Sequence, residues 1–438
     1  MLSSSTRRAR IMMERVKRKK NPLIYKSWSK KRKHKWLARR QRQERRFRRR
    51  GFIAVLVSML FLGALLVSII MKGYTAFLKT RILLPVEFTA QAIEQDDYGL
   101  LIRNALQQIF PEAADPGKIR DLQALVSRMA VHRLRDMVKL DPALTGQKQE
   151  IWLPASSDVD ILFKSRLYDL PDKRGRMSDE QAEWITDLAA RDMLKLTFNT
   201  EFFTGADSRE PEQAGVLGAV MGSFFTILVC IAFAFPLGVA TAIYLEEFAP
   251  KNWLTDLVEI NINNLAAVPS IIFGLLGLSI YLNFFELPRS SSLVGGLVLA
   301  ILILPVIVIA TRNAVRAVPD SIRYAAAALG ATPVQVAFHH TFIYALPGMM
   351  TGVILGIARA LGETAPLLMI GMVAFITDIP QDLTDPAVTL PVQVFLWANN
   401  PETGFVEKTS AAIIVLLVFL VSINALAIYI RRRFEIKW

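Results

Sequence analysis

Two charged residues interrupt one of the most apolar stretches of this chain. Between residues 324 and 376 the only Asp, Glu, Lys or Arg residues are Arg359 and Glu363. On a helix, side chains four residues apart lie on one face, so the two charges would meet. Arg359 follows Pro347 by 12 residues, about 18 Å of helix, which would place it near the middle of a membrane. An arginine at that depth costs about 2.5–3.5 kcal/mol on insertion scales and needs a compensating partner.

Two interpretations of this pair stay open. In the first, Arg359 is a cation that lines the path of an anion, and Glu363 holds its side chain in one rotamer. In the second, the two charges neutralise each other and only help helices to pack. Arg312 is another candidate cation at the end of an apolar stretch, although its side chain would equally well reach back to the lipid headgroups. We expect no catalytic residue and no metal site in this chain. The single cysteine, Cys230, lies within an apolar run, so no zinc or redox pair can be built from cysteines.

A proline lies within another apolar stretch. Pro269, followed by Ser270, leaves a backbone carbonyl without its helical partner. Membrane helices tolerate such a break where neighbours or a water-lined path satisfy the freed group. Both residues are therefore candidates for a bend at a gate in the same path, and a static kink is the alternative.

The segment 324–333 is predicted to form a compact projection. Its run of alanines favours a short helix with a small profile. Gly330 stands where that helix would end in the left-handed conformation, and Thr332 followed by Pro333 can begin a second helix. Two short helices joined at a glycine would fit a groove of a partner, although an ordinary interfacial loop has a similar composition. The candidate contact residues are Tyr324, Ala325, Ala326, Gly330, Thr332 and Pro333.

The chain carries no recognisable ATP site. The nearest phosphate-loop candidate is Gly117-Lys118, where Ile119 replaces the required Ser or Thr and Glu112 replaces the first glycine. A process driven by ATP would therefore need the nucleotide on another polypeptide.

Charge is strongly segregated along the chain. The 438 residues are 53% hydrophobic yet 21% charged, which fits a membrane protein only if the charges are set apart. Residues 1–51 hold 22 of the 52 Lys and Arg residues and two acids, and the rest of the chain carries 30 Lys and Arg against 36 Asp and Glu. We expect this basic tail to set the topology and to bind anionic membrane lipid. Its interleaved Trp28 and Trp36 leave nucleic-acid binding as the less favoured alternative.

Six apolar stretches are long enough to cross a membrane, which takes about 20 residues. Basic residues gather on the cytoplasmic side, so the tail, the loop 312–345 and the Arg431–Arg433 end are predicted to lie inside. The segment 72–193 then lies outside. The six stretches are Phe52–Met71, Ala214–Leu245, Ile260–Phe285, Ser290–Thr311, the interrupted stretch Tyr324–Ile376, and Thr409–Ile430.

The outside segment is long enough for a small α+β domain. Residues 115–129 begin with Asp-Pro and repeat apolar residues at helical spacing, and residues 178–181 have capping-box spacing. Ile151–Leu153 and Asp160–Phe163 are candidate strands.

The predicted fold is an all-α membrane protein of six transmembrane helices with an inserted external α+β domain. Its predicted parts are a basic cytoplasmic tail (1–51), a first transmembrane helix (52–71), the inserted periplasmic domain (72–193) and a five-helix transmembrane domain (194–438).

The segment 324–333 resembles the coupling loop of ABC importer permeases, whose pattern is Glu-Ala-Ala, three residues and Gly. Ala325, Ala326 and Gly330 match this spacing, whereas Tyr324 stands where Glu is usual. The resemblance extends from about residue 194 to the C-terminus and is greatest to the PstA family of phosphate permeases. The region from about 80 to 190 has no counterpart in the short loop typical of that family. The segments that carry the resemblance are Phe202–Gly205, Pro236–Glu247, Val268–Gly274 and, most specifically, Ile357–Pro366.

This resemblance implies the permease subunit of an ATP-driven phosphate importer in the bacterial inner membrane, with both termini cytoplasmic. The implied partners are a second homologous permease, two ATP-binding subunits that hold the ATP, and a periplasmic phosphate-binding protein. No cofactor is implied for this chain. The alternatives are a permease for another oxyanion, such as sulfate or molybdate, and a membrane-anchored sensor whose external domain binds a ligand.

Overall fold

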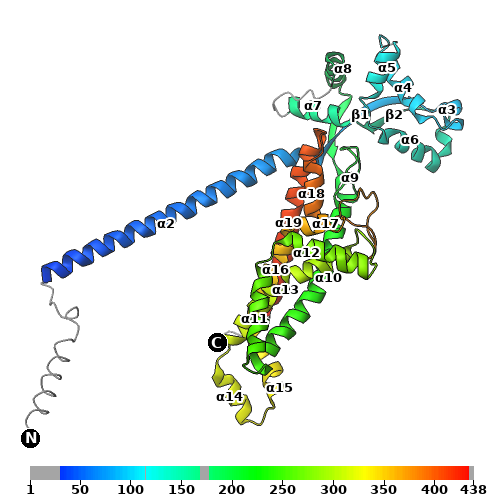
Figure 1. Cartoon of the computed structure of the whole chain (residues 1–438). Coiled ribbons are helices and arrows are strands. Elements are labelled where there is room, and N and C mark those ends of the chain that lie inside the picture. The colour runs from blue at the N-terminus through cyan, green and yellow to red at the C-terminus, as the bar shows by residue number, and fades with distance from the viewer. Residues whose placement is uncertain (1–29, 114, 168–176, 434–438) are drawn as a thin grey trace, which may run out of the picture. The chain divides into compact units, whose positions relative to one another are not determined.

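The computed structural model of the chain describes residues 30–113, 115–167 and 177–433 (Figure 1). These residues form many helices and one small sheet, and they fall into two compact units that divide after Val67.

A single helix of 44 residues, α2 (Lys30–Gly73), carries the end of the basic tail and the first apolar stretch. Its Arg, Lys and Gln residues favour helix, and neither Gly nor Pro occurs between residues 30 and 50. The helix therefore starts 22 residues before the predicted transmembrane stretch, which begins at Phe52. At 1.5 Å per residue it is about 66 Å long, more than enough to cross a membrane.

The inserted domain is built on a three-stranded antiparallel sheet in the order β2-β1-β3. Central strand β1 pairs Ile82 with Leu153 on one side and with Leu194 on the other. Ile82, Leu84 and Val86 are fully buried, so every second residue of β1 faces the helices of the domain. The elements are β1 (Leu78–Glu87), α3 (Ala90–Glu94), α4 (Tyr98–Ile109), α5 (Pro116–Gln123), α6 (Met129–Leu140), β2 (Lys148–Pro154), α7 (Ser157–Leu167), α8 (Asp179–Ala190) and β3 (Leu194–Phe198).

Several local predictions in this domain are confirmed. Ser178 and Gln181 form the expected capping box at the start of α8, and Ile151–Leu153 lies within β2. Strand β3 begins at Leu194, just past the boundary predicted at residue 193, so the sheet continues beyond that boundary.

Two other local predictions are wrong. Asp160–Phe163 is helical, because Asp160 lies in the first turn of α7 and Lys164 four residues later pairs with it across one helical turn. The helix predicted over 115–129 ends at Gln123, and Met129 starts α6 instead.

The core of the second unit's membrane part is a bundle of long apolar helices. Helices α10, α13 and α16 approach closely at glycines: a Cβ on Gly296 would lie 2.5 Å from Cβ of Val229, and one on Gly352 would lie 2.4 Å from Cβ of Ala310. Small residues of this kind let membrane helices pack backbone to backbone. The elements are α9 (Thr200–Thr204), α10 (Leu217–Ile243), α13 (Ser292–Arg316), α14 (Asp320–Ala328), α15 (Pro333–Gln335), α16 (Phe342–Gly362), α17 (Ala365–Met369), α18 (Leu390–Ala398) and α19 (Gly404–Arg433).

The apolar stretch predicted as one helix over Ile260–Phe285 is broken in the structure. Helix α11 (Trp253–Ala266) and the pair formed by α12 (Ser270–Gly277) and the π-helical η4 (Leu278–Phe284) meet at an angle of 102°. Pro269 lies at the break with ψ of 136°, an extended conformation. A proline there cannot donate the bond that would continue the helix.

The stretch predicted over Tyr324–Ile376 is also divided. Its continuous helix starts at Pro333, passes through the π-helical η5 (Val336–Thr341), and ends with α16 at Gly362. Among the described residues, five helices are long and apolar enough to cross a membrane, or six if the bent pair is one span. The prediction of six transmembrane helices with an inserted α+β domain is thus confirmed. Within the second unit, the inserted domain and the α14–α15 projection lie at opposite ends of the bundle (Figure 1).

Candidate functional site

Two helix breaks lie close to each other, because the short helices that follow them pack together. One lies before α12, at Pro269, and the other follows α16, where Glu363 is extended before the short α17 begins. Gly274 of α12 packs on α17, since a Cβ at Gly274 would lie 2.7 Å from Cα of Pro366. Broken helices at membrane depth occur where the chain lines a cavity or is buried in protein.

Arg359 lies in the last turn of α16, beside the second break. The distance from its Nε to Oε1 of Glu363 is 3.8 Å, and the two side chains are 34% and 22% exposed. The two charges therefore meet as an ion pair four residues apart, as predicted, although Glu363 is the C-cap of the helix and has an extended backbone. Arg359 is therefore only loosely paired, and a cation at a helix C-terminus is favoured by the helix dipole.

Arg312 lies in a different environment. Its Nε donates to Oε1 of Glu246 at 2.6 Å, its Nη2 lies 2.8 Å from Oε2 of Glu259, and its side chain is 9% exposed. Arg316 donates to the other oxygen of Glu246 at 2.9 Å. Arg312 thus connects the end of α10, α11 and α13, and its two carboxylates favour a bracing role. Its role in a substrate path stays a prediction.

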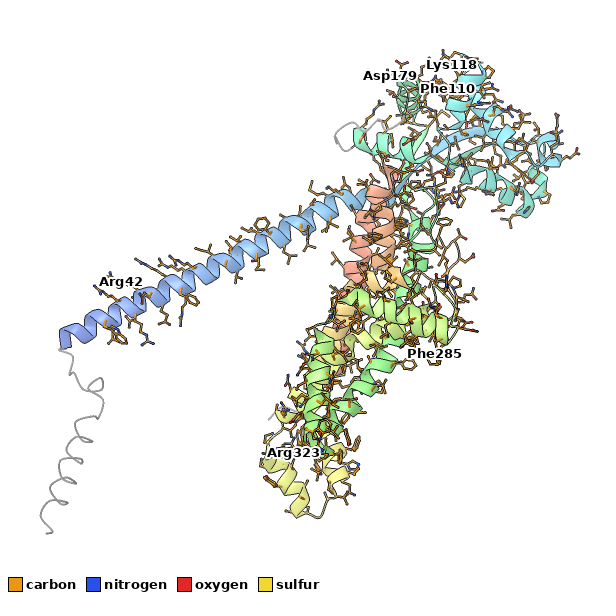
Figure 2. The ribbon with its side chains drawn as sticks, viewed as in Figure 1. Arg42, Phe110, Lys118, Asp179, Phe285 and Arg323 are labelled. Carbon is orange, nitrogen blue, oxygen red and sulfur yellow. The ribbon has the colours of Figure 1, made fainter. Side chains whose placement is uncertain are left out.

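Another arginine, Arg323, which is labelled in Figure 2, anchors α14 to the bundle. Its guanidinium donates to Oε1 of Glu247 at 3.1 and 3.0 Å, to the carbonyl of Val318 at 2.7 Å and to the carbonyl of Val315 at 2.9 Å. These carbonyls lie at the C-terminal end of α13, where helices leave acceptors unpaired. Asp320 accepts a further bond at 3.0 Å. The planar fork of Arg suits such a multiple contact, which Lys cannot reproduce.

The adjacent Glu246 and Glu247 therefore bind two different helices. Glu246 pairs with arginines of α13, and Glu247 pairs with Arg323 of α14. Both glutamates lie on the π-helical η3 (Tyr244–Phe248) that continues α10. The sequence alone indicated only that the basic loop 312–345 lies inside, and it indicated no role for the two glutamates. One sequence feature could have predicted these pairs. Two adjacent acids end one apolar stretch, and three arginines follow another apolar stretch on the same predicted side of the membrane.

The projection formed by α14 and α15 agrees with the sequence prediction. Gly330 has φ of +86°, and the bonds Gly330 N–H to Ala327 O and Ala331 N–H to Ala326 O form a Schellman motif. Thr332 begins the next helix through a capping box with Gln335. Two apolar side chains project outward here: Tyr324 is 73% and Leu329 is 89% exposed.

Among the described residues, no group of three or more His, Cys, Asp or Glu has the arrangement of a metal site. The candidate residues lie in three places, one of which is the Arg312 cluster with Glu246 and Glu259. Arg359, Glu363, Pro269 and Ser270 lie at the two helix breaks, whereas the α14–α15 residues lie at the end of the bundle.

The chain is similar to known proteins over two parts of its length. Residues 234–436 match the family described as "Binding-protein-dependent transport system inner membrane component", and residues 34–171 match "Domain of unknown function (DUF3333)". The phosphate transport system permease protein PstA of Haemophilus influenzae is 32% identical over 224 residues, which cover 51% of this chain and 78% of that protein. PstA of Yersinia pestis is 34% identical over 213 residues, 49% of this chain and 71% of that protein. An inward-facing structure of the MetNI methionine ABC transporter has a TM-score of 0.41 at 17% identity, covering 50% of this chain and 97% of its own.

The candidate membrane spans, the family match over residues 234–436 and the similarity to PstA define a multi-pass permease subunit of an ABC importer. Such a subunit lacks an ATPase domain of its own. Within that class, the chain belongs to the PstA family of ABC transporter permeases.

Proposed function

We propose that this chain forms one half of the path by which phosphate crosses the membrane. The observation that carries the proposal is Arg359, a loosely paired cation beside the helix break at Glu363. The helix α17 that follows this break packs on α12, which follows the break at Pro269. A guanidinium matches the geometry of an oxyanion through two parallel hydrogen bonds. The names of the relatives, which are phosphate permeases, support phosphate as that oxyanion.

In this mechanism the breaks at Pro269 and Glu363 form the gate. Arg359 binds the phosphate while Glu363 limits the strength of that interaction, so the anion can leave again. Ser270, at the start of α12, supplies a hydroxyl on the same side of the break. Access alternates between the two sides of the membrane as the broken helices move around this point.

The α14–α15 projection is the part that contacts the ATPase. Leu329 and Tyr324 offer an exposed apolar tip for a groove in that subunit. Arg323 transmits displacement of the tip to Glu247 and to the end of α13. The same displacement moves the adjacent Glu246, which is paired with Arg312. Arg312 is also paired with Glu259 on α11, the helix that precedes the Pro269 break, so the displacement reaches that break.

The complete transporter then contains a second homologous permease, two ATP-binding subunits and an external phosphate-binding protein. We place it in the bacterial inner membrane with both termini and the α14–α15 projection in the cytoplasm. The inserted domain lies outside, at the opposite end of the bundle (Figure 1).

Reconstitution of the four-part complex in liposomes tests this function. We expect ATP-dependent uptake of radiolabelled phosphate that excess unlabelled phosphate abolishes and excess sulfate or molybdate leaves intact. Uptake of sulfate or molybdate in place of phosphate would reassign the substrate. Absence of ATP-dependent uptake of all three oxyanions would refute the transport role of the site.

A further inference from the structure

A cleft of about 700 Å³ opens between the inserted domain and the permease. One wall comes from the inserted domain, with Ser127 and Arg128 before α6 and Asp158 at the start of α7. The other wall comes from residues 210–212, which precede α10, and residues 401–404, which lead into α19. The volume is in the range of sites that hold a ligand or several side chains.

Ion pairs and close packing join the two walls to each other beside the cleft. Lys164 on α7 is 2% exposed and donates to Asp160 at 2.5 Å and to Glu407, in the first turn of α19, at 3.4 Å. Burial alone would lower the pKa of Lys164, but the two carboxylates raise it overall, so the ammonium stays charged. Gly404 lies against Ser157, because a Cβ at Gly404 would lie 2.1 Å from Oγ of Ser157. The inserted domain is thus held on the start of the last span.

Carboxylates outnumber cations along the cleft. Arg128 is already paired with Glu210 at 3.3 Å. Glu212 is 7% exposed, and burial raises its pKa. Hydrogen bonds from its own backbone and from Ser127, together with the positive charge of Lys79, oppose that rise without cancelling it. In the part of the chain that the structure describes, no Lys or Arg nitrogen makes an ion pair with Glu212. The charged lining residues are Asp158, Glu210, Glu212 and Glu402 against Arg120 and Arg128.

We propose that this cleft receives a lysine or arginine side chain from a projecting loop of the binding protein that delivers substrate to the transporter. The proposal rests on the proposed function, because only an importer of this class needs such a delivery protein. The surplus of carboxylates over arginines attracts a cation. The burial of Glu212 is only partly offset by its hydrogen bonds and by Lys79, so a further positive charge nearby would stabilise its charged form. The cleft is too wide for a bare metal ion, whereas a side chain with its backbone fits the volume.

The position of the cleft agrees with such an occupant. Its lining residues belong to the inserted domain and to the segments that precede α10 and α19. The inserted domain lies at the end of the second unit that is opposite the α14–α15 projection (Figure 1). An occupant would touch residues 210–212 and 401–404, which lead directly into α10 and α19. Docking would therefore displace the residues at the starts of α10 and α19. The inserted domain would supply the outer wall of the docking site.

The test measures the affinity of the purified binding protein for the reconstituted transporter. The variant Asp158→Asn with Glu402→Gln removes two negative charges from opposite walls of the cleft. The control variant Asp136→Asn with Glu150→Gln removes two charges from exposed positions on the inserted domain. Size-exclusion chromatography of both variants establishes that the complex is assembled before binding is measured.

We expect the cleft variant to raise the Kd about tenfold at low salt, mainly through slower association, and the control to leave the Kd unchanged. The difference should shrink as ionic strength rises. A single reversal, Glu402→Lys, should weaken binding further. Equal affinities for wild type, cleft variant and control would overturn the proposal.

Two other outcomes are distinct from that result. If the cleft variants lose the second permease during chromatography, the cleft holds that subunit and the docking proposal is wrong. If wild-type liposomes take up no phosphate although the binding protein docks through the cleft, the proposed substrate fails and the docking site stands.

Discussion

Neutralising Arg359 and Glu363 together separates a transport role from a structural one. The two side chains are partly exposed and 3.8 Å apart, and Glu363 lies beyond the end of the helix. Ion pairs with such exposure contribute about 0.2–1 kcal/mol, and the cation adds about 0.3–1 kcal/mol at the helix C-terminus. The double variant Arg359→Gln with Glu363→Gln should therefore lose about 2 kcal/mol of stability at most and still assemble.

The expected effect on transport is larger. A charge-assisted hydrogen bond from Arg359 to the passing oxyanion is worth about 1.5–3 kcal/mol. Its loss without a change in assembly would lower the rate of uptake about 10- to 100-fold. Arg359→Lys keeps the charge but loses the planar fork, so its rate should lie between those of the wild type and the double variant.

The assay is the initial rate of ATP-driven uptake of radiolabelled phosphate by liposomes that contain equal amounts of assembled complex. Arg433→Gln is the matched control, because it removes an exposed arginine in the last turn of α19 and should transport normally. Wild-type uptake by the double variant would refute the role of Arg359 in the path. Failure of the double variant to assemble would show that the pair stabilises the fold far more than its exposure implies.

Three further predictions concern the projection and the segment between α9 and α10. Gly330→Asp strains a residue with φ of +86°, so ATP hydrolysis should no longer respond to substrate, whereas Gly330→Asn should retain part of the response. Arg323→Ala should lower transport per ATP hydrolysed about tenfold, as it removes an anchor worth roughly 1.5–3 kcal/mol per bond to a charged group; an unchanged ratio would contradict the coupling role. Burial raises the pKa of Asp207, opposed by the bond from Trp397 and others, so the folded state binds the proton more tightly than the unfolded state does. Stability should therefore rise as the pH falls from above the folded pKa towards 3.8, and Asp207→Asn should abolish this trend in hydrogen-exchange protection corrected for intrinsic rates.

The sequence predicts those features that depend on neighbouring residues. Hydropathy places the apolar helices, and the order Gly330, Thr332, Pro333 predicts the turn of the projection because each residue type has one favoured backbone role there. The four-residue segment Asp160–Phe163 is too short for its pattern to separate strand from helix, and the structure makes it helical.

Features that depend on direction or on distant residues are not predictable in this way. Hydropathy carries no information about the direction of a chain after a proline. The sequence therefore predicts one span with either a bend at a gate or a static kink at Pro269, whereas the structure has two helices that meet at 102°. The partner of Arg323 is Glu247, 76 residues away, and only the packing of α10 against α13 brings the two together. The closeness of the two breaks has the same origin, because Gly274 and Pro366 meet through tertiary packing alone.

The strand order of the inserted domain has a consequence for its synthesis. The central strand β1 is made first, pairs with β2 next, and gains its second neighbour only when Leu194–Phe198 has been made. Until then one edge of β1 exposes unpaired backbone groups, which are a template for wrong pairing with another chain. Pairing Leu78 with Phe198 also brings the two ends of the insertion together, shortly before α10 begins at Leu217. A chain whose synthesis stops before residue 194 would thus keep an open sheet edge. The sheet can be completed only shortly before the next membrane helix, α10, is synthesised.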